Sequence, residues 1–214
     1  MKLVLIGSPG AGKGTQAKVL SSHFNIAHIS TGDLLREEIN QKTELGLKIT
    51  DIINSGQLVS DDILAELLAS RVKKDDCKNG FILDGYPRNT QQADELPSLV
   101  GEIDKVVLIE VQDEFIIERM VGRRSCPKCG MMYHIKYNPS EKEGICNGCD
   151  VDLQQRKDDN EEVVANRIAI YHKTTSPIID YYKNKGILLE VSGIGEISQI
   201  SQELISTLEN QGAK

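Results

Sequence analysis

The chain has 214 residues and carries 25 Lys and Arg against 32 Asp and Glu, a formal net charge of −7. This acidic balance argues against broad nucleic-acid binding, where positive surface charge supplies most of the non-specific affinity. Hydrophobic residues make up 39% of the chain and aromatic residues only 4%, so the core is expected to be aliphatic.

No apolar run approaches the roughly 20 residues that a membrane helix needs. The first apolar stretch, residues 2–7, is too short for a signal peptide and has no small-residue cleavage site, so it is expected to be a strand. These features predict a soluble, cytoplasmic protein that has no membrane partner.

Short runs rich in Leu, Ile and Val recur along the chain and are separated by segments with helical spacing. This alternation predicts an α/β fold in which a doubly wound parallel sheet of about five strands is covered by helices on both faces. Strands are expected at 3–6, 27–29, 81–83, 106–111 and 187–191. Helices are expected at 15–24, 63–72, 115–121, from 161 onward with a bend or break at Pro177, and after 191.

Two stretches interrupt this rhythm and are predicted to be inserts. Residues 30–59 are expected to form two or more helices, with turns at Gly46 and near Ser55 and Gly56. Residues 122–159 contain Cys, Gly and Pro and lack helical periodicity. The predicted core domain then consists of 1–29, 60–121 and 160–214.

The segment 7–15, Gly-Ser-Pro-Gly-Ala-Gly-Lys-Gly-Thr, follows the first strand and opens a helix, which is the context of a phosphate-binding loop. Its glycines let backbone N–H groups approach phosphate oxygens, the helix N-terminus adds partial positive charge, and Lys13 is a point charge for the β- and γ-phosphates. The hydroxyl of Thr15 is displaced one position from the general motif by Gly14. A Gly-rich strand–helix turn without a ligand is the alternative.

A second phosphate site is predicted just past the strand at 81–83. Arg88 offers a planar fork for phosphate, and Asp84 is placed to hold magnesium through water. Gln92 lies one helical turn later and can pair with a base edge. Thr31 and Arg36 could reach a phosphate at another helix start, although an N-cap followed by a surface Arg is the commoner explanation.

Five arginines flank the second insert. Arg119 and Arg123 share a helix face if the helix extends that far. Such a set favours a shared phosphate site, where positioning and electrostatics drive phosphoryl transfer, over solvated surface charges. The set is Arg119, Arg123, Arg124, Arg156 and Arg167.

The second insert contains two C-x2-C pairs, which predict one tetrahedral zinc ion held by four thiolates. Four thiolates leave no open coordination position, so the expected role is structural. Unliganded thiols, two disulfides after oxidation, and iron are the alternatives. The ligands would be Cys126, Cys129, Cys146 and Cys149, whereas the remaining Cys77 is expected to be a core or surface residue.

Together these motifs resemble the adenylate kinases, and within them the zinc-bearing bacterial form with a long lid. The phosphate loop with its displaced Thr, the Asp-Gly-Tyr-Pro-Arg segment, the arginines and the cysteine pairs occur in the order of that family, over nearly the whole chain. The resemblance implies Mg²⁺-dependent transfer of the ATP γ-phosphoryl group to AMP, giving two ADP. It also implies an AMP-binding insert at 30–59, a lid at 122–159 that closes to exclude water, and a monomer.

The resemblance further implies the roles of individual residues. Catalysis is assigned to Lys13, Arg88, Arg123, Arg156, Arg167, Asp158 and Asp159. ATP contacts are assigned to Gly10, Ala11, Gly12, Lys13, Gly14, Thr15, Arg119, Arg123, Met132, Tyr133 and Gly195. AMP contacts are assigned to Thr31, Arg36, Gln57, Leu58, Val59, Gly85, Tyr86, Pro87, Arg88, Gln92, Arg156 and Arg167.

Two other functions stay open at this point. The acceptor could be UMP, CMP or GMP instead of AMP. A non-enzymatic zinc-ribbon module that binds nucleotide or nucleic acid is opposed by the negative charge and by the phosphate loop.

Overall fold

The computed structural model describes residues 1–211. Its main sheet contains five parallel strands, in the order β2-β3-β1-β4-β7. The five predicted strands are confirmed, with ends that differ by one residue or none. They are β1 (Lys2–Ile6), β2 (Ala27–Ser30), β3 (Phe81–Asp84), β4 (Lys105–Glu110) and β7 (Leu188–Ser192).

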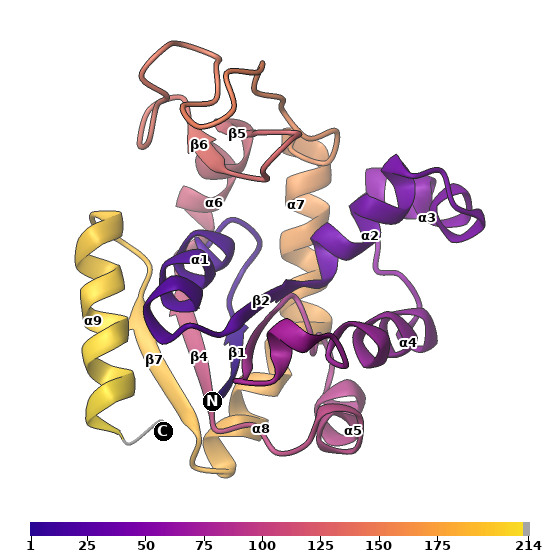
Figure 1. Ribbon diagram of the computed structural model, residues 1–214, viewed down its shortest axis with the longest axis vertical. Helices are drawn as coiled ribbons and strands as arrows, with labels where there is room; N and C mark the ends of the chain where they lie inside the picture. Colours follow the sequence, from indigo (N-terminus) through magenta and orange to yellow (C-terminus); the bar gives the residue numbers. More distant parts are fainter. Residues whose placement is uncertain (212–214) are drawn as a thin grey trace.

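Helices cover both faces of this sheet, as predicted, with α1 and α9 on one face and α4, α5 and α8 on the other (Figure 1). The helices are α1 (Lys13–Phe24), α2 (Thr31–Asn40), α3 (Glu44–Asn54), α4 (Asp61–Arg71), α5 (Thr90–Val100), α6 (Asp113–Val121), α7 (Glu161–Ile170), α8 (Pro177–Asn184) and α9 (Ile197–Asn210), with a short 3-10 helix η1 (Asp75–Cys77) and a π-helical segment η2 (Tyr171–Thr175). None of the helices within residues 1–211 combines the length and the apolar character needed to cross a membrane.

The central strand shows why the strand sequences are apolar throughout. Leu3 and Leu5 of β1 pack with α1 and α9, whereas Val4 and Ile6 pack with α4, α5 and α8. Alternate side chains of a strand point to opposite faces, so a strand covered on both faces must be apolar at every position. Because β3 and β4 flank β1 on opposite sides, the winding direction changes at β1, and a ligand crevice forms at the carboxyl ends of the strands there.

The first insert contains α2 and α3, as expected, but one predicted turn is wrong. The chain turns between Asn40 and Glu44, and Gly46 lies inside α3. A Cβ atom at Gly46 would lie 2.1 Å from the carbonyl oxygen of Glu38 in α2. Gly46 therefore permits close helix packing and does not make a turn. The predicted turn after α3 is confirmed at Gly56, whose φ is 73°.

The second insert contains a short antiparallel hairpin, β5 (Arg123–Ser125) and β6 (Met132–His134), followed by turns. Because α6 ends at Val121, Arg123 lies on β5, and the expectation that it continues the face of Arg119 on one helix is wrong. The predicted break near Pro177 is confirmed, since η2 separates α7 from α8 and Pro177 is the first residue of α8. The predicted core segment 160–214 includes residues 212–214, which lie outside the described residues.

Candidate active site

A cavity of about 530 Å³ lies at the carboxyl ends of β1, β2 and β3, between the two inserts. Its walls come from the phosphate loop, α2, α6, α7, the β5–β6 hairpin and the loop before α9. Its volume is in the range of small-molecule sites. Most of the predicted site residues line it: Gly10, Ala11, Gly12, Lys13, Gly14, Thr15, Arg36, Leu58, Asp84, Gly85, Pro87, Arg88, Arg119, Arg123, Met132, Tyr133, Arg156, Arg167 and Gly195.

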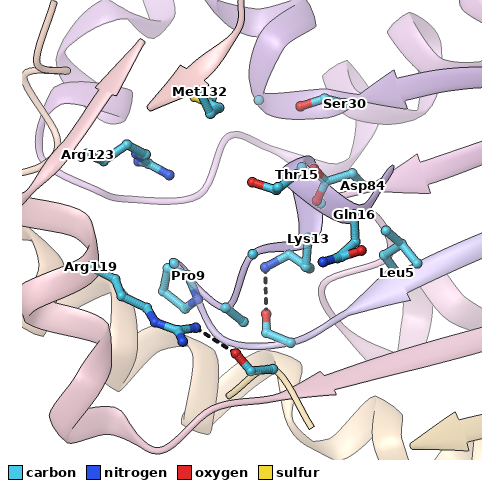
Figure 2. A pocket seen from close by; sticks show the side chains of 18 of the residues that line it. Leu5, Pro9, Lys13, Thr15, Gln16, Ser30, Asp84, Arg119, Arg123 and Met132 are labelled. Carbon is cyan, nitrogen blue, oxygen red and sulfur yellow. Dashed lines mark hydrogen bonds between the residues drawn. The ribbon is translucent and has the colours of Figure 1, made fainter. Parts of the chain in front are cut away.

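The phosphate loop has the backbone that its glycines predict. Gly10 and Gly12 have φ values of 80° and 99°, which side chains with a Cβ rarely adopt. Lys13 donates hydrogen bonds to the carbonyl oxygens of Gly7 (2.8 Å) and Ser8 (2.9 Å), and the first of these is visible in Figure 2. Burial, reinforced by the charge of Arg88, lowers the pKa of Lys13 to about 8 despite the opposing charge of Asp84. Within residues 1–211, Lys13 is thus a cation without an anionic hydrogen-bond partner.

Asp84 ends β3 and its carboxylate lies close to Thr15 of the loop (Figure 2). The Nε2 atom of His28, on the adjacent strand β2, lies 3.6 Å from Asp84 Oδ2. Burial acts to raise the pKa of Asp84, but the His28 imidazole and the charge of Lys13 outweigh it, and the pKa lies below its ordinary value. A carboxylate held ionised beside a hydroxyl is the oxygen-donor chemistry that Mg²⁺ prefers.

Six arginines line the same cavity, and burial lowers the pKa of three of them. Burial and the charge of Arg167 lower the pKa of Arg88 to about 10. Burial and the charge of Arg36 lower the pKa of Arg156 to about 9. Burial also lowers the pKa of Arg167, although Asp158 opposes this. Such a cavity is complementary to a polyanion, since phosphates would relieve the repulsion among these cations.

Carboxylates partly neutralise the arginines in the structure. Arg123 donates from Nε to Asp159 Oδ2 at 2.8 Å, and Arg167 donates to Asp158 Oδ2 at 2.6 Å. Asp159 is fully buried and Asp158 is 7% exposed. The two lid carboxylates therefore act from behind the arginines and do not line the cavity.

One carboxylate joins the two inserts. Asp33 Oδ1 accepts a hydrogen bond from Arg36 Nη2 at 2.6 Å within α2, and a longer one of 3.4 Å from Arg156 Nη2 of the lid. Two predicted phosphate ligands from different inserts therefore share one anionic partner.

Several other predicted residues lie behind the cavity wall. Thr31 is 2% exposed and donates to the carbonyl oxygen of Gly85 at 3.0 Å. Gln92 is 1% exposed, and its amide bonds to the backbone of Arg88 and to Asp61. The predicted residues that do not line the cavity are Thr31, Gln57, Val59, Tyr86, Gln92, Arg124, Asp158 and Asp159. Arg124, expected to share the phosphate site, instead donates to the carbonyl oxygens of Val121 and Arg123.

Several apolar residues that line the cavity were not predicted from the sequence. Phe115 lies one helical turn before Arg119 on α6, a spacing that could have revealed it. Tyr137 and Ile194 occupy irregular segments, where no periodicity marks them. Arg119 itself donates to the carbonyl oxygen of Gly193 at 2.9 Å (Figure 2). These residues give one part of the cavity the apolar and cationic surface that suits a planar base.

The four predicted zinc ligands converge in the second insert. Their Sγ atoms all lie within 4.8 Å of one another, and those of Cys129 and Cys146 are 3.7 Å apart. Tetrahedral Zn–S bonds of about 2.3 Å require S···S separations of about 3.8 Å, so the arrangement fits zinc. The hydroxyl of Tyr133 lies 3.6 Å from Cys146 Sγ and accepts a hydrogen bond from Asn147 N. No thiol in residues 1–211 is in a disulfide.

Comparison with known proteins gives a consistent result. The family model described as adenylate kinase matches residues 5–187. An adenylate kinase of Caldicellulosiruptor saccharolyticus is 50% identical, over 97% of this chain and 99% of that protein. Adenylate kinases of Clostridium perfringens (strain SM101) and Clostridium botulinum (strain Hall) are 48% and 49% identical, over 97% and 94% of this chain and 98% and 94% of their own lengths.

Proposed function

Because the chain belongs to the adenylate kinase family and is an ATP:AMP phosphotransferase, we propose that its arginine-lined cavity is where the γ-phosphoryl group passes from ATP to AMP. The observation that carries this proposal is the gathering of Lys13 and six arginines around one cavity. Phosphoryl transfer needs its negative charge dispersed and its two oxygens aligned, and asks for little covalent chemistry. The alternative acceptors are not favoured by the relatives named above, which are adenylate kinases.

ATP occupies the half of the cavity beside the phosphate loop. Its phosphates receive hydrogen bonds from the backbone of residues 10–15, and Lys13 exchanges its two carbonyl partners for phosphate oxygens. Its adenine lies against Arg119, beside Phe115, with Met132, Tyr133 and Gly195 contributing backbone contacts. Arg123 binds ATP phosphate.

AMP occupies the half beside α2. Arg88 and Arg36 bind its phosphate, and the loop at 57–59, the segment at 85–87 and Thr31 form its surroundings. Since Gln92 lies behind the cavity wall, its contact with the AMP base requires the first insert to move. Arg156 and Arg167 bridge the phosphates of both nucleotides, and Asp158 and Asp159 hold Arg167 in place from behind.

The two inserts act as flaps on the core. Residues 30–59 close on AMP and residues 122–159 close on ATP, while 1–29, 60–121 and 160–211 keep the sheet rigid. Closure excludes water, so the phosphoryl group reaches AMP and is not lost to hydrolysis. The ion pair that Asp33 makes with Arg156 must open so that both arginines can bind phosphate.

Two metals fit this scheme. Asp84 would hold the hydrated magnesium ion that accompanies ATP, with Thr15 beside it, and the ion would neutralise charge on the β- and γ-phosphates. The four-cysteine cluster would hold a structural zinc ion in the lid. A monomer in the cytoplasm that does not bind nucleic acid is the remaining part of the proposal, and it rests on the family alone.

The test is ADP formation from ATP, AMP and magnesium, run beside UMP, CMP and GMP. Strong activity with AMP alone is expected. Equal activity with another monophosphate would mean that AMP is not the specific acceptor. A folded, zinc-loaded protein that forms no ADP would refute the placement of transfer in this cavity.

A further inference from the structure

Asp61, a residue without a role so far, bonds to two amide side chains of the AMP side. It is the first residue of α4, immediately after the first insert. One of its carboxylate oxygens accepts from Gln92 Nε2 at 2.6 Å, and the other accepts from Asn89 Nδ2 at 2.9 Å. Asn89 in turn caps α5 by accepting from the backbone N–H of Gln92 at 2.8 Å.

These bonds define which way the amide of Gln92 faces. Its Oε1 atom accepts from the backbone N–H of Arg88 at 2.6 Å, while its Nε2 atom donates to Asp61. A backbone N–H can only donate and an ionised carboxylate can only accept, so both partners require the same orientation. A reversed amide would place an N–H against the Arg88 N–H and an oxygen against the carboxylate, and Gln92 is too buried for water to compensate.

The orientation of an amide decides which purine it matches. On its pairing edge adenine offers a donor at N6 and an acceptor at N1, whereas guanine offers an acceptor at O6 and a donor at N1. A side-chain amide has one N–H and one oxygen lone pair left after the bonds described above. Held in one orientation it complements one purine, and reversed it complements the other.

We propose that Asp61 is a positioning residue that sets the base preference of the AMP site, by holding the amide of Gln92 in the orientation that matches adenine and opposes guanine. This inference rests on the proposed contact between Gln92 and the AMP base. The same network includes the backbone of Arg88, so it also ties base recognition to the residue that binds the AMP phosphate.

The test compares Asp61→Asn with Asp62→Asn. Both substitutions remove one negative charge from the first turn of α4, so their effects on the helix terminus are matched. Asp62 is exposed and makes no side-chain hydrogen bond within residues 1–211. An Asn side chain at position 61 has one acceptor oxygen in place of the two carboxylate oxygens that receive Gln92 Nε2 and Asn89 Nδ2. It therefore no longer enforces one orientation of the Gln92 amide.

In Asp61→Asn the ratio of kcat/KM for AMP to that for GMP should fall at least about tenfold, while the KM for ATP is unchanged. Asp62→Asn should keep the parental ratio. Gln92→Ala, measured alongside, should also lower the ratio. If only Gln92→Ala lowers it, the role of Asp61 is wrong and the base contact stands. If neither does, the proposed base contact is wrong as well.

A measurement on the unmutated protein covers the case in which Asp61→Asn does not fold. With AMP bound, NMR should detect scalar coupling across the hydrogen bond between Gln92 Nε2 and the carboxyl carbon of Asp61. Detection supports the fixed amide, and its absence in the folded complex overturns the inference.

Discussion

Lys13 enters the catalytic cycle with an unusual protonation equilibrium. Its pKa of about 8 in the free protein reflects burial first, which the charge of Asp84 opposes and the repulsion of nearby arginines reinforces. ATP phosphates favour the charged amine, so binding raises this pKa. Below pH 8 the amine is already protonated, and above pH 8 binding must take up a proton. We therefore expect the affinity for ATP at pH 9 to be about tenfold weaker than at pH 7.

Titration calorimetry at pH 8.5 in two buffers of different ionisation enthalpy measures this uptake directly. Lys13→Met, which cannot be protonated, is the matched control and should bind ATP more weakly with much less uptake. An affinity that stays constant from pH 7 to pH 9 in the parent protein would contradict the assignment.

Arg88 is expected to act on AMP far more than on ATP. Its Nε atom donates to the carbonyl oxygen of Gly85 at 2.7 Å, which leaves the two terminal nitrogens of its fork for phosphate. Loss of a charge-assisted hydrogen bond costs about 1.5–3 kcal/mol. Arg88→Ala should therefore lower kcat/KM for AMP by about tenfold to 100-fold. Steady-state kinetics with varied AMP and varied ATP separates the two substrates.

Arg71→Ala is the control for this substitution. Arg71 pairs with Asp76 at the end of α4 and does not line the cavity. The Arg71→Ala variant should keep the parental KM for AMP even if it lowers stability. A raised KM in Arg88→Ala alone would therefore reflect lost phosphate binding and not a general loss of stability. Near-normal kinetics in Arg88→Ala would remove Arg88 from the AMP site.

At the scale of elements, the proposed lid, residues 122–159, is expected to depend on the proposed zinc ion because it has little else to hold it. Its buried cluster consists of Cys126, Tyr133 and Cys146, with only a few partly buried neighbours. So small an apolar core cannot offset the entropy of ordering nearly forty residues, and metal binding must supply the difference. Cys129→Ser should therefore lower both zinc content and melting temperature, with less effect on turnover in the cold.

Elemental analysis and calorimetry check this expectation together. Cys77→Ser removes a thiol outside the cluster, beside Arg71 on the core, and should retain about one zinc per chain. If Cys129→Ser binds zinc as tightly and melts as high as the parent, the ligand set is wrong.

The elements that the sequence predicted best are the five strands of the main sheet. The strands are covered on both faces, so unbroken apolar runs marked them to within a residue. Gly46 misled because a glycine needed for helix contact looks like one needed for a turn. The hydrogen bonding of the buried Gln92 could not be foreseen, since one partner of its amide is Asp61, thirty-one residues earlier. Tyr137 and Ile194 lie on irregular backbone that only the assembled fold brings to the cavity.

At the scale of the whole molecule, the acidic chain concentrates positive charge at one place. The net charge is −7, yet six arginines and Lys13 line one cavity, and several of them have lowered pKa values because burial and mutual repulsion oppose their charge. The free protein therefore carries unfavourable electrostatic energy that bound phosphates would remove. The core, the lid and the first insert all contribute cations, so this energy couples the three parts.

Nucleotides should consequently stabilise the entire fold, and only when their phosphates are present. With ATP and AMP at about 1,000 times their Kd, without magnesium so that transfer is slow, the gain is about 4.1 kcal/mol per site. At about 2–4 °C per kcal/mol for a chain of this size, each fully bound site should raise Tm by about 8–16 °C. Adenosine at the same concentration should raise Tm little.

Salt gives a second test of the same idea. Because the Debye length falls from about 10 Å at 0.1 M salt to about 3 Å at 1 M, added salt should reduce the rise in Tm at fixed nucleotide concentration. If Tm rises equally with adenosine, or if the rise with nucleotide does not change with salt concentration, the base and not the charge of the phosphates holds the three parts together.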